Sequence, residues 1–161
     1  MMSPRLIRRF MHGKAKVLVL YILDTDHVSM WLEDDPVVCR NIEIHRSDLV
    51  ITIVTVQEVF NGWISRLNHP SEAHRQVSLY AKLSSVVMLL KEVDVLDFDH
   101  EADHFFRTML NQNPSLRKSR LQKDMRIASI ALANDAIVVT RNYRDFVQVP
   151  NLKILDWSVC G

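Results

Sequence analysis

Two short apolar runs without polar alternation constrain the fold of this chain most strongly. Residues 16–23 read KVLVLYIL, and residues 49–54 read LVITIV. A strand with one face in water alternates apolar and polar residues, whereas a strand buried on both faces of a parallel sheet is apolar throughout. Both runs have the length of strands and are rich in Val, Leu and Ile. We therefore predict two central strands of a mainly parallel sheet.

The rest of the chain supplies the helices and further strands that such a sheet needs. Helical spacing of apolar residues and end signals predict helices over 26–33, 36–45, 55–68, 71–90, 99–111 and 124–134, and shorter runs predict strands over 93–96, 136–140 and 152–155. Parallel strands require crossover connections, so this alternation indicates an α/β fold, a three-layer sandwich whose mainly parallel central sheet is flanked by helices. The length of 161 residues suits one domain, which we place at 16–161.

The first 15 residues are basic and form a separate segment. Arg8 and Arg9 precede an apolar run at 17–23, which imitates a secretory or twin-arginine signal. No small-residue cleavage site follows, because the run ends in Asp24-Thr25-Asp26. We interpret residues 1–15 as a basic leader that is disordered or non-native. The run is also much shorter than the roughly 20 residues that span a bilayer, so we expect no membrane contact.

Charge and cysteine content limit the kinds of partner. The 20 Lys and Arg balance 19 Asp and Glu, so nucleic-acid binding has to come from local patches. Cys39 and Cys160 lie far apart without a C-x-x-C motif, which fits neither a disulfide framework nor a thiolate metal site. We expect reduced thiols in a cytoplasmic protein.

Three acidic residues follow predicted strands or begin a helix at the same edge of the sheet. Asp24 ends the first strand, Glu58 lies one helical turn after the second, and Asp124 opens the helix before strand 136–140. Ligands of open α/β sheets bind beyond the carboxyl ends of the strands. Converging carboxylates repel each other unless a cation neutralises them, and oxygen ligands alone indicate Mg²⁺ or Mn²⁺. Such a site suits phosphodiester hydrolysis by metal-activated water.

Each of these residues also has a purely structural interpretation. Thr55 to Glu58 matches a capping box, in which Glu58 bonds back to the backbone of Thr55. Asp124 suits a helix N-terminus, Asp24 suits a turn, and Asp26 is the expected cap of the first helix. The joint position of the three acidic residues favours the functional interpretation.

These residues lie in stretches that resemble the PIN-domain toxins of the VapC family, which are ribonucleases of type II toxin-antitoxin systems. The resemblance rests on YILDTDHVS, ITIVTVQEVFNGW, DMRIASIALANDAIVVTRNYRDF and VPNLKILDW, and spans about residues 19 to 157. It implies that Asp24 and Asp124 are metal-binding aspartates and that Glu58 is the family's glutamate. It also implies a PIN-like fold, Mg²⁺-dependent endoribonuclease activity, a cytoplasmic homodimer and inhibition by a cognate antitoxin.

The fourth acidic position of the family is altered. In many PIN domains it directly follows a Thr-Arg pair after the fourth strand, where this chain has Asn142. Asp145 follows three residues later and is our candidate for the fourth catalytic carboxylate, with Asn142 as the alternative position.

Basic residues surround the predicted site and could contact the RNA backbone. They are Arg117, Lys118, Arg120, Lys123 and Arg126 before and within the 124–134 helix, and Arg141 and Arg144 after strand 136–140. The alternatives are a solvated loop for the first group, and ion pairs with carboxylates of the antitoxin or of this chain for the second.

Other functions remain open on motif grounds. His100 to His104 matches the H-E-x-x-H motif of zinc peptidases, but no His or Glu follows it as a third ligand. Asp24 and Asp26 after an apolar strand also resemble the nucleophile and the acid-base of haloacid-dehalogenase-type phosphatases, although the later acidic pair of that class is missing. A catalytically degenerate PIN module that binds RNA or protein is a third alternative, favoured by Asn142.

Overall fold

The computed structural model describes residues 19–159, and its centre is a five-stranded sheet in the order β3-β2-β1-β4-β5. The strands are β1 (Tyr21–Leu23), β2 (Leu49–Thr52), β3 (Asp94–Leu96), β4 (Ile137–Val139) and β5 (Lys153–Leu155). All four neighbouring pairs run parallel. The predicted leader at 1–15 and the first residues of the predicted strand at 16–23 lie outside the described residues.

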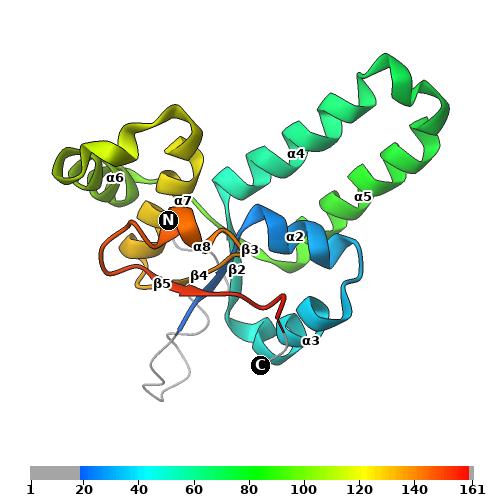
Figure 1. The fold of residues 1–161 in the computed structure, drawn as a ribbon. Helices are drawn as coiled ribbons and strands as arrows, with labels where there is room; N and C mark the ends of the chain where they lie inside the picture. The colour runs from blue at the N-terminus through cyan, green and yellow to red at the C-terminus, as the bar shows by residue number, and fades with distance from the viewer. Residues whose placement is uncertain (1–18, 160–161) are drawn as a thin grey trace.

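Helices cover both faces of this sheet (Figure 1). They are α2 (Thr25–Leu32), α3 (Pro36–His45), α4 (Ile53–Leu67), α5 (Gln76–Glu92), α6 (His100–Gln112), α7 (Gln122–Ala133) and α8 (Tyr143–Phe146). Helices α6 and α7 lie on one side and α2 and α3 on the other, while α4 and α5 extend side by side beyond the sheet (Figure 1). Short 3₁₀ helices connect some of them, at Arg46–Asp48, Pro70–Arg75, Pro114–Arg117 and Ser119–Leu121. The predicted PIN-like α/β sandwich is confirmed.

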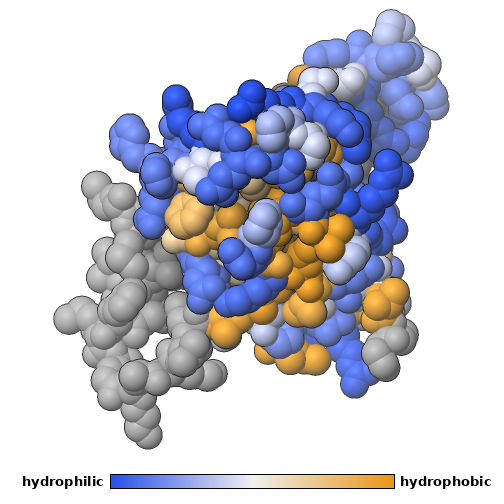
Figure 2. All heavy atoms as spheres, turned by 60° about the vertical axis from the view of Figure 1, so that its left-hand side comes forward, coloured by the Kyte–Doolittle hydropathy of each residue, from blue (hydrophilic) through white to orange (hydrophobic). Residues whose placement is uncertain are grey.

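The surface is mainly hydrophilic but carries exposed apolar side chains. With the α6 side brought forward, hydrophobic side chains gather in the middle and lower part of the face, beneath a hydrophilic band (Figure 2). The most exposed large apolar residues of the described part include Val77 and Tyr80 on α5 and Tyr143 on α8. No helix within residues 19–159 is long and apolar enough to cross a membrane.

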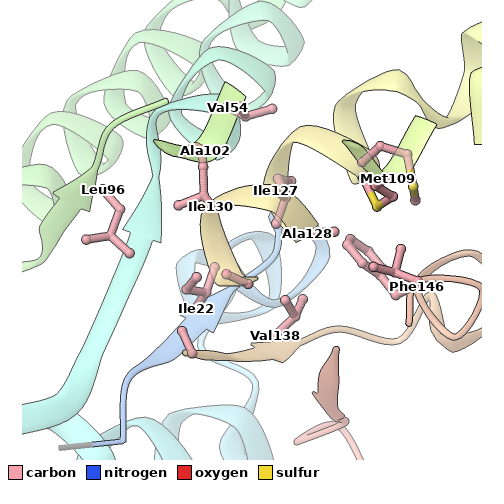
Figure 3. Close-up of a cluster of buried hydrophobic side chains, with 14 of the residues drawn as sticks. Ile22, Val54, Leu96, Ala102, Met109, Ile127, Ala128, Ile130, Val138 and Phe146 are labelled. Atoms are coloured by element: carbon pink, nitrogen blue, oxygen red, sulfur yellow. The ribbon is translucent and has the colours of Figure 1, made fainter. Parts of the chain in front are cut away.

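Two hydrophobic cores, one on each face of the sheet, explain the apolar strand runs. Neighbouring strand residues point to opposite faces, so Ile22 packs into the α6–α7 core while Leu23 packs into the α2–α3 core. In the first core, Ile127 and Ile130 of α7 lie against Ile22 and Val138 of the sheet (Figure 3). The central strands therefore have no solvent-facing side, which is why their sequences lack alternation.

Several helix starts differ from the sequence predictions, and two of them matter for the site. Strand β2 ends at Thr52, whose Oγ1 accepts a hydrogen bond from the Thr55 N–H at 3.1 Å and caps α4. The predicted capping box of Thr55 and Glu58 is therefore wrong, because Thr55 is already inside the helix. Asp124 lies in the first turn of α7, which begins two residues earlier than predicted.

The cap of the first helix is also corrected. The N-cap of α2 is Asp24 rather than Asp26, which lies in the first turn. The predicted long helix from residue 71 begins as the 3₁₀ helix Pro70–Arg75 and becomes α-helical only at Gln76.

Candidate active site

Asp24 lies at the carboxyl end of the central strand and is held there by three hydrogen bonds. Its Oδ1 accepts a hydrogen bond from the Thr25 N–H at 2.8 Å, and its Oδ2 accepts one from Thr140 Oγ1 at 2.9 Å. Its own N–H donates to the Val139 carbonyl oxygen at 3.0 Å, which extends the pairing of β1 with β4. With only 6% of its surface exposed, Asp24 is a buried carboxylate with a fixed orientation.

Asp24 and Asp124 are electrostatically coupled, and the surroundings of both disfavour their ionisation. Burial, followed by the charge of Asp26 and a smaller effect of Asp124, raises the pKa of Asp24 to about 7. Burial and the charges of Glu58 and Asp145 raise the pKa of Asp124 to about 6. The fold thus brings the predicted carboxylates into one cluster in which ionisation is disfavoured.

Glu58 faces this cluster from α4, the helix that Thr52 caps. Its Oε2 accepts a hydrogen bond from Thr25 Oγ1 at 2.5 Å, and its Oε1 lies 3.4 Å from Lys123 Nζ. Thr25 and Lys123 therefore position Glu58 and partly compensate its charge.

Asn142 and Asp145 lie beside Asp124, but both are held within the protein. The Asn142 amide donates to Asp124 Oδ2 at 3.0 Å and to Asp145 Oδ2 at 3.1 Å. Arg120 Nη1 lies 3.0 Å from each carboxylate oxygen of Asp145. Burial favours the neutral form of Asp145, but the hydrogen bonds from Asn142 and Arg120 outweigh it and lower the pKa. Asp145 is therefore a charged, paired group next to the cluster.

The donor chemistry fits a magnesium ion bound by two carboxylates. Within residues 19–159, no group of three or more His, Cys, Asp or Glu is arranged closely enough to hold a metal ion. Mg²⁺ commonly uses only one or two carboxylates together with waters and substrate phosphates. The raised pKa values of Asp24 and Asp124 indicate charges that a cation would neutralise. Glu58 as a third ligand stays a prediction.

Most of the basic residues singled out in the sequence are engaged within the chain. Arg117 donates to the Leu110 carbonyl and to Asn111 Oδ1, at 3.0 and 3.1 Å. Arg120 binds Asp145, and the Arg141 guanidinium lies 3.6 Å from Asp26.

The remaining basic residues are distributed differently. Arg126 stacks over the Phe106 ring at 5.4 Å, while Lys118 and Arg144 are exposed. Both side chains are therefore open to a ligand from solution.

Several residues that shape the site were not identified from the sequence. Thr25 and Thr140 orient the carboxylates, and fully buried His27 lies between Asp26 and Trp157. The sequence indicated His27 only through its position directly after Asp26. Its partner Trp157 is 130 residues away in the chain. His100 and His104 of the H-E-x-x-H match are exposed on α6.

Comparisons with known proteins agree with this fold. No family model matches the chain. A curated relative, Ribonuclease VapC2 of Rickettsia felis, is 30% identical over 78 residues, which is 47% of this chain and 56% of the relative's length.

Solved structures match over a larger part of the chain. VapBC-1 from nontypeable Haemophilus influenzae has a TM-score of 0.71 at 19% identity, over 88% of this chain and 100% of that chain. DNA-bound VapBC from Salmonella typhimurium has a TM-score of 0.68 at 22% identity, over 86% and 98%. VapBC2 from Rickettsia felis, bound to a DNA fragment from its promoter, has a TM-score of 0.66 at 23% identity, over 86% and 99%. These structures show that the chain shares their fold, and the Rickettsia felis ribonuclease is similar to it in sequence over the matched residues.

Proposed function

We propose that this chain, which has the fold of the VapC toxins, is a Mg²⁺-dependent endoribonuclease and the toxin of a toxin-antitoxin pair. The observation that carries the proposal is the coupled pair of buried Asp24 and half-buried Asp124, whose pKa values are raised by burial and by neighbouring carboxylates, so that a cation bound between them would relieve the cost of their ionisation. The sequence similarity to a ribonuclease of Rickettsia felis supports RNA as the substrate.

In this proposal Asp24 and Asp124 hold the ion, with Mn²⁺ as a possible substitute, and Glu58 faces the same cluster. Bound Mg²⁺ would lower the pKa of a water and stabilise charge on the scissile phosphate. The chain's own residues then orient the ligands: Thr140 fixes Asp24, and Asn142 fixes Asp124.

In this proposal, exposed basic side chains bind the substrate. Lys118 and Arg144 are exposed near the site and would contact RNA phosphates. Lys123 lies 3.4 Å from Glu58 and would reach the substrate only by leaving that carboxylate.

We also propose a cognate antitoxin as partner, a homodimer and a cytoplasmic location. The similar solved structures are VapBC complexes, which supports a protein partner. A pocket of about 300 Å³ opens between α2, α4 and α5, and Thr25 and Glu58 contribute to its lining, so a partner bound there would lie next to the carboxylates.

The phosphatase alternative is opposed by the surroundings of Asp26. Its Oδ1 bonds to His27 Nδ1 at 2.8 Å and its Oδ2 accepts the Arg141 N–H at 3.0 Å. Hydrogen bonds from His27 lower the pKa of Asp26 despite its burial, which suits a fixed anion rather than an acid that transfers protons.

The experiment that tests the proposal incubates purified, partner-free protein with total cellular RNA in Mg²⁺ or EDTA. Wild-type protein is expected to give discrete products with Mg²⁺ only, and Asp24→Asn and Asp124→Asn to give none. Glu101→Gln, an exposed carboxylate on α6, is the matched control and should cleave normally.

Two results would contradict the proposal. RNA left intact by folded wild-type protein with Mg²⁺ would favour the binding module, and release of phosphate from a phosphate monoester under the same conditions would favour the phosphatase. Cleavage that persists in both aspartate variants would exclude Asp24 and Asp124 as its source.

A further inference from the structure

A buried histidine that the proposed mechanism does not use connects the C-terminal segment to the site. His27 on α2 is fully buried, and its Nε2 accepts the Trp157 N–H at 3.1 Å. An accepting Nε2 carries no proton, so in a neutral ring the proton lies on Nδ1. Nδ1 therefore donates to Asp26 Oδ1, 2.8 Å away. Both ring nitrogens have defined and opposite roles.

Asp26 connects His27 to the turn after β4 by a second hydrogen bond. Its Oδ2 accepts the Arg141 N–H at 3.0 Å. The two neighbours of Arg141 hold the carboxylate pair, because Thr140 Oγ1 donates to Asp24 and the Asn142 amide donates to Asp124. The position of this turn thus decides whether both carboxylates keep their hydrogen bonds.

The other side of His27 is anchored by an aromatic cluster. The Trp157 ring stacks on His45 at 5.0 Å and contacts Tyr21 at 5.3 Å. The Trp157 carbonyl accepts a weak hydrogen bond from Asn41 Nδ2 at 3.4 Å. Trp157 therefore fixes the position of the His27 ring, and the ring in turn orients Asp26 through its hydrogen bond.

One further acidic group faces the ring. Asp156 Oδ1 lies 3.4 Å from His27 Nε2, but it already accepts hydrogen bonds from the Ser158 N–H at 2.8 Å and Ser158 Oγ at 2.6 Å. The Trp157 N–H remains the nearer partner of Nε2.

We propose that His27 is a positioning residue: through Asp26 and Arg141 it holds Thr140 and Asn142 against the Asp24 and Asp124 carboxylates. Its effect on catalysis rests on the proposed ribonuclease function, whereas the chain of hydrogen bonds does not. A histidine that merely filled the core would need neither a particular tautomer nor a particular partner.

Two variants separate the two ring nitrogens. An Asn amide reaches roughly the place of Nδ1 and a Gln amide that of Nε2, so His27→Asn keeps the donor to Asp26 while His27→Gln keeps the acceptor for Trp157. Loss of an outer partner of a ligand typically costs about 10–100-fold in activity, so His27→Gln should lower kcat by at least about tenfold with little change in KM. His27→Asn should retain most of the activity, although both variants lose thermal stability.

Asn41→Ala is the matched control. It removes a contact to Trp157 without touching Asp26, and its kcat should remain close to that of wild type. Equal losses of kcat in His27→Gln and His27→Asn would show that His27 only fills the core and would overturn the proposal.

NMR spectroscopy of the protein tests the same idea without an activity assay. The Arg141 amide resonance should move in His27→Gln and stay near its wild-type position in His27→Asn. If wild-type protein cleaves no RNA, the proposed function fails, and the Arg141 resonance still decides whether His27 positions the turn. Nitrogen-15 spectra of histidine-labelled wild type should show His27 protonated on Nδ1 alone; the opposite tautomer would overturn the proposal even if no variant folds.

Discussion

At the scale of single residues, the carboxylates of the site differ in whether a basic side chain compensates their charge. Glu58 lies near Lys123, and Asp145 is paired with Arg120. Asp24 and Asp124 accept hydrogen bonds from the neutral groups of Thr140 and Asn142 and face other carboxylates, whose effect on Asp124 exceeds that of Arg120, so their charge is costly in the folded protein. This imbalance is the physical basis of the proposed metal site.

The raised pKa of Asp24 predicts that the metal-free protein loses stability as the pH rises. The folded state retains a proton on Asp24 up to about pH 7, whereas the unfolded state releases it near the ordinary value of 3.8. The resulting stabilisation is fully present below pH 4 and is lost as the pH rises through about 7, and Asp124 acts in the same direction.

Asp24→Asn should therefore flatten the dependence of the unfolding free energy on pH in EDTA. The variant should also be more stable than wild type at pH 8, because it carries no buried charge there. Chemical denaturation from pH 5 to 8 measures both effects. Parallel curves for the two proteins would contradict the assigned pKa shift.

Asn142 predicts a second, metal-linked effect on stability. Its amide donates to Asp124 and Asp145, so Asn142→Asp replaces two donations with repulsion. A hydrogen bond to a charged group contributes about 1.5–3 kcal/mol, and each kcal/mol corresponds to about 2–4 °C in Tm for a protein of this size. We expect a Tm lower by several degrees in EDTA and partly restored by Mg²⁺. An equal Tm loss with and without Mg²⁺ would place Asn142 outside the metal's influence.

At the scale of elements, the sequence predicted which segments are strands and helices better than where they begin. The apolar runs and the signals at Pro36 and Asp99 located the sheet strands and several helices, because these depend on local patterns. The end of β2 at Thr52 could not be predicted, since Val54 suits a strand as well as the first turn of α4. The contact of His27 with Trp157 was equally hidden, because it joins segments distant in the chain.

The cap at Thr52 predicts a measurable contribution to stability. Thr52 is fully buried, and its Oγ1 contacts both the Thr55 N–H and Thr55 Oγ1. Thr52→Val keeps the shape but removes the acceptor, and should cost about 1–2 kcal/mol. Ser84→Ala, an exposed change on α5, should stay within about 0.5 kcal/mol. Equal unfolding free energies of the Thr52 and Ser84 variants would contradict the capping role.

At the scale of the whole molecule, function depends on where the charges lie rather than on their sum. The net charge is +1, and several arginines near the site are paired within the chain. RNA affinity should therefore depend on few phosphate contacts and change moderately with salt.

Lys118 and Arg144 should account for part of that salt dependence. Replacing both with Ala should weaken RNA binding and reduce the slope of log K against log salt by on the order of one, since each phosphate contact on a single strand contributes about 0.7. The control pair Arg40→Ala and Lys91→Ala, exposed on α3 and α5, should leave the slope unchanged. Filter binding at several salt concentrations measures the slopes, and identical slopes in both double variants would contradict the assigned contacts.

The central claim is that Asp24 and Asp124 form a site whose repulsion a divalent cation relieves. Calorimetric titration of partner-free protein with Mg²⁺ tests it directly when repeated in buffers of different ionisation enthalpy. Because the two carboxylates have pKa values of about 7 and 6, Mg²⁺ binding should release protons near pH 6.5, and release should vanish above pH 8. Both the binding heat and the proton release should disappear in Asp24→Asn. Mg²⁺ binding that releases no protons at pH 6.5, or that persists unchanged in Asp24→Asn, would contradict the account.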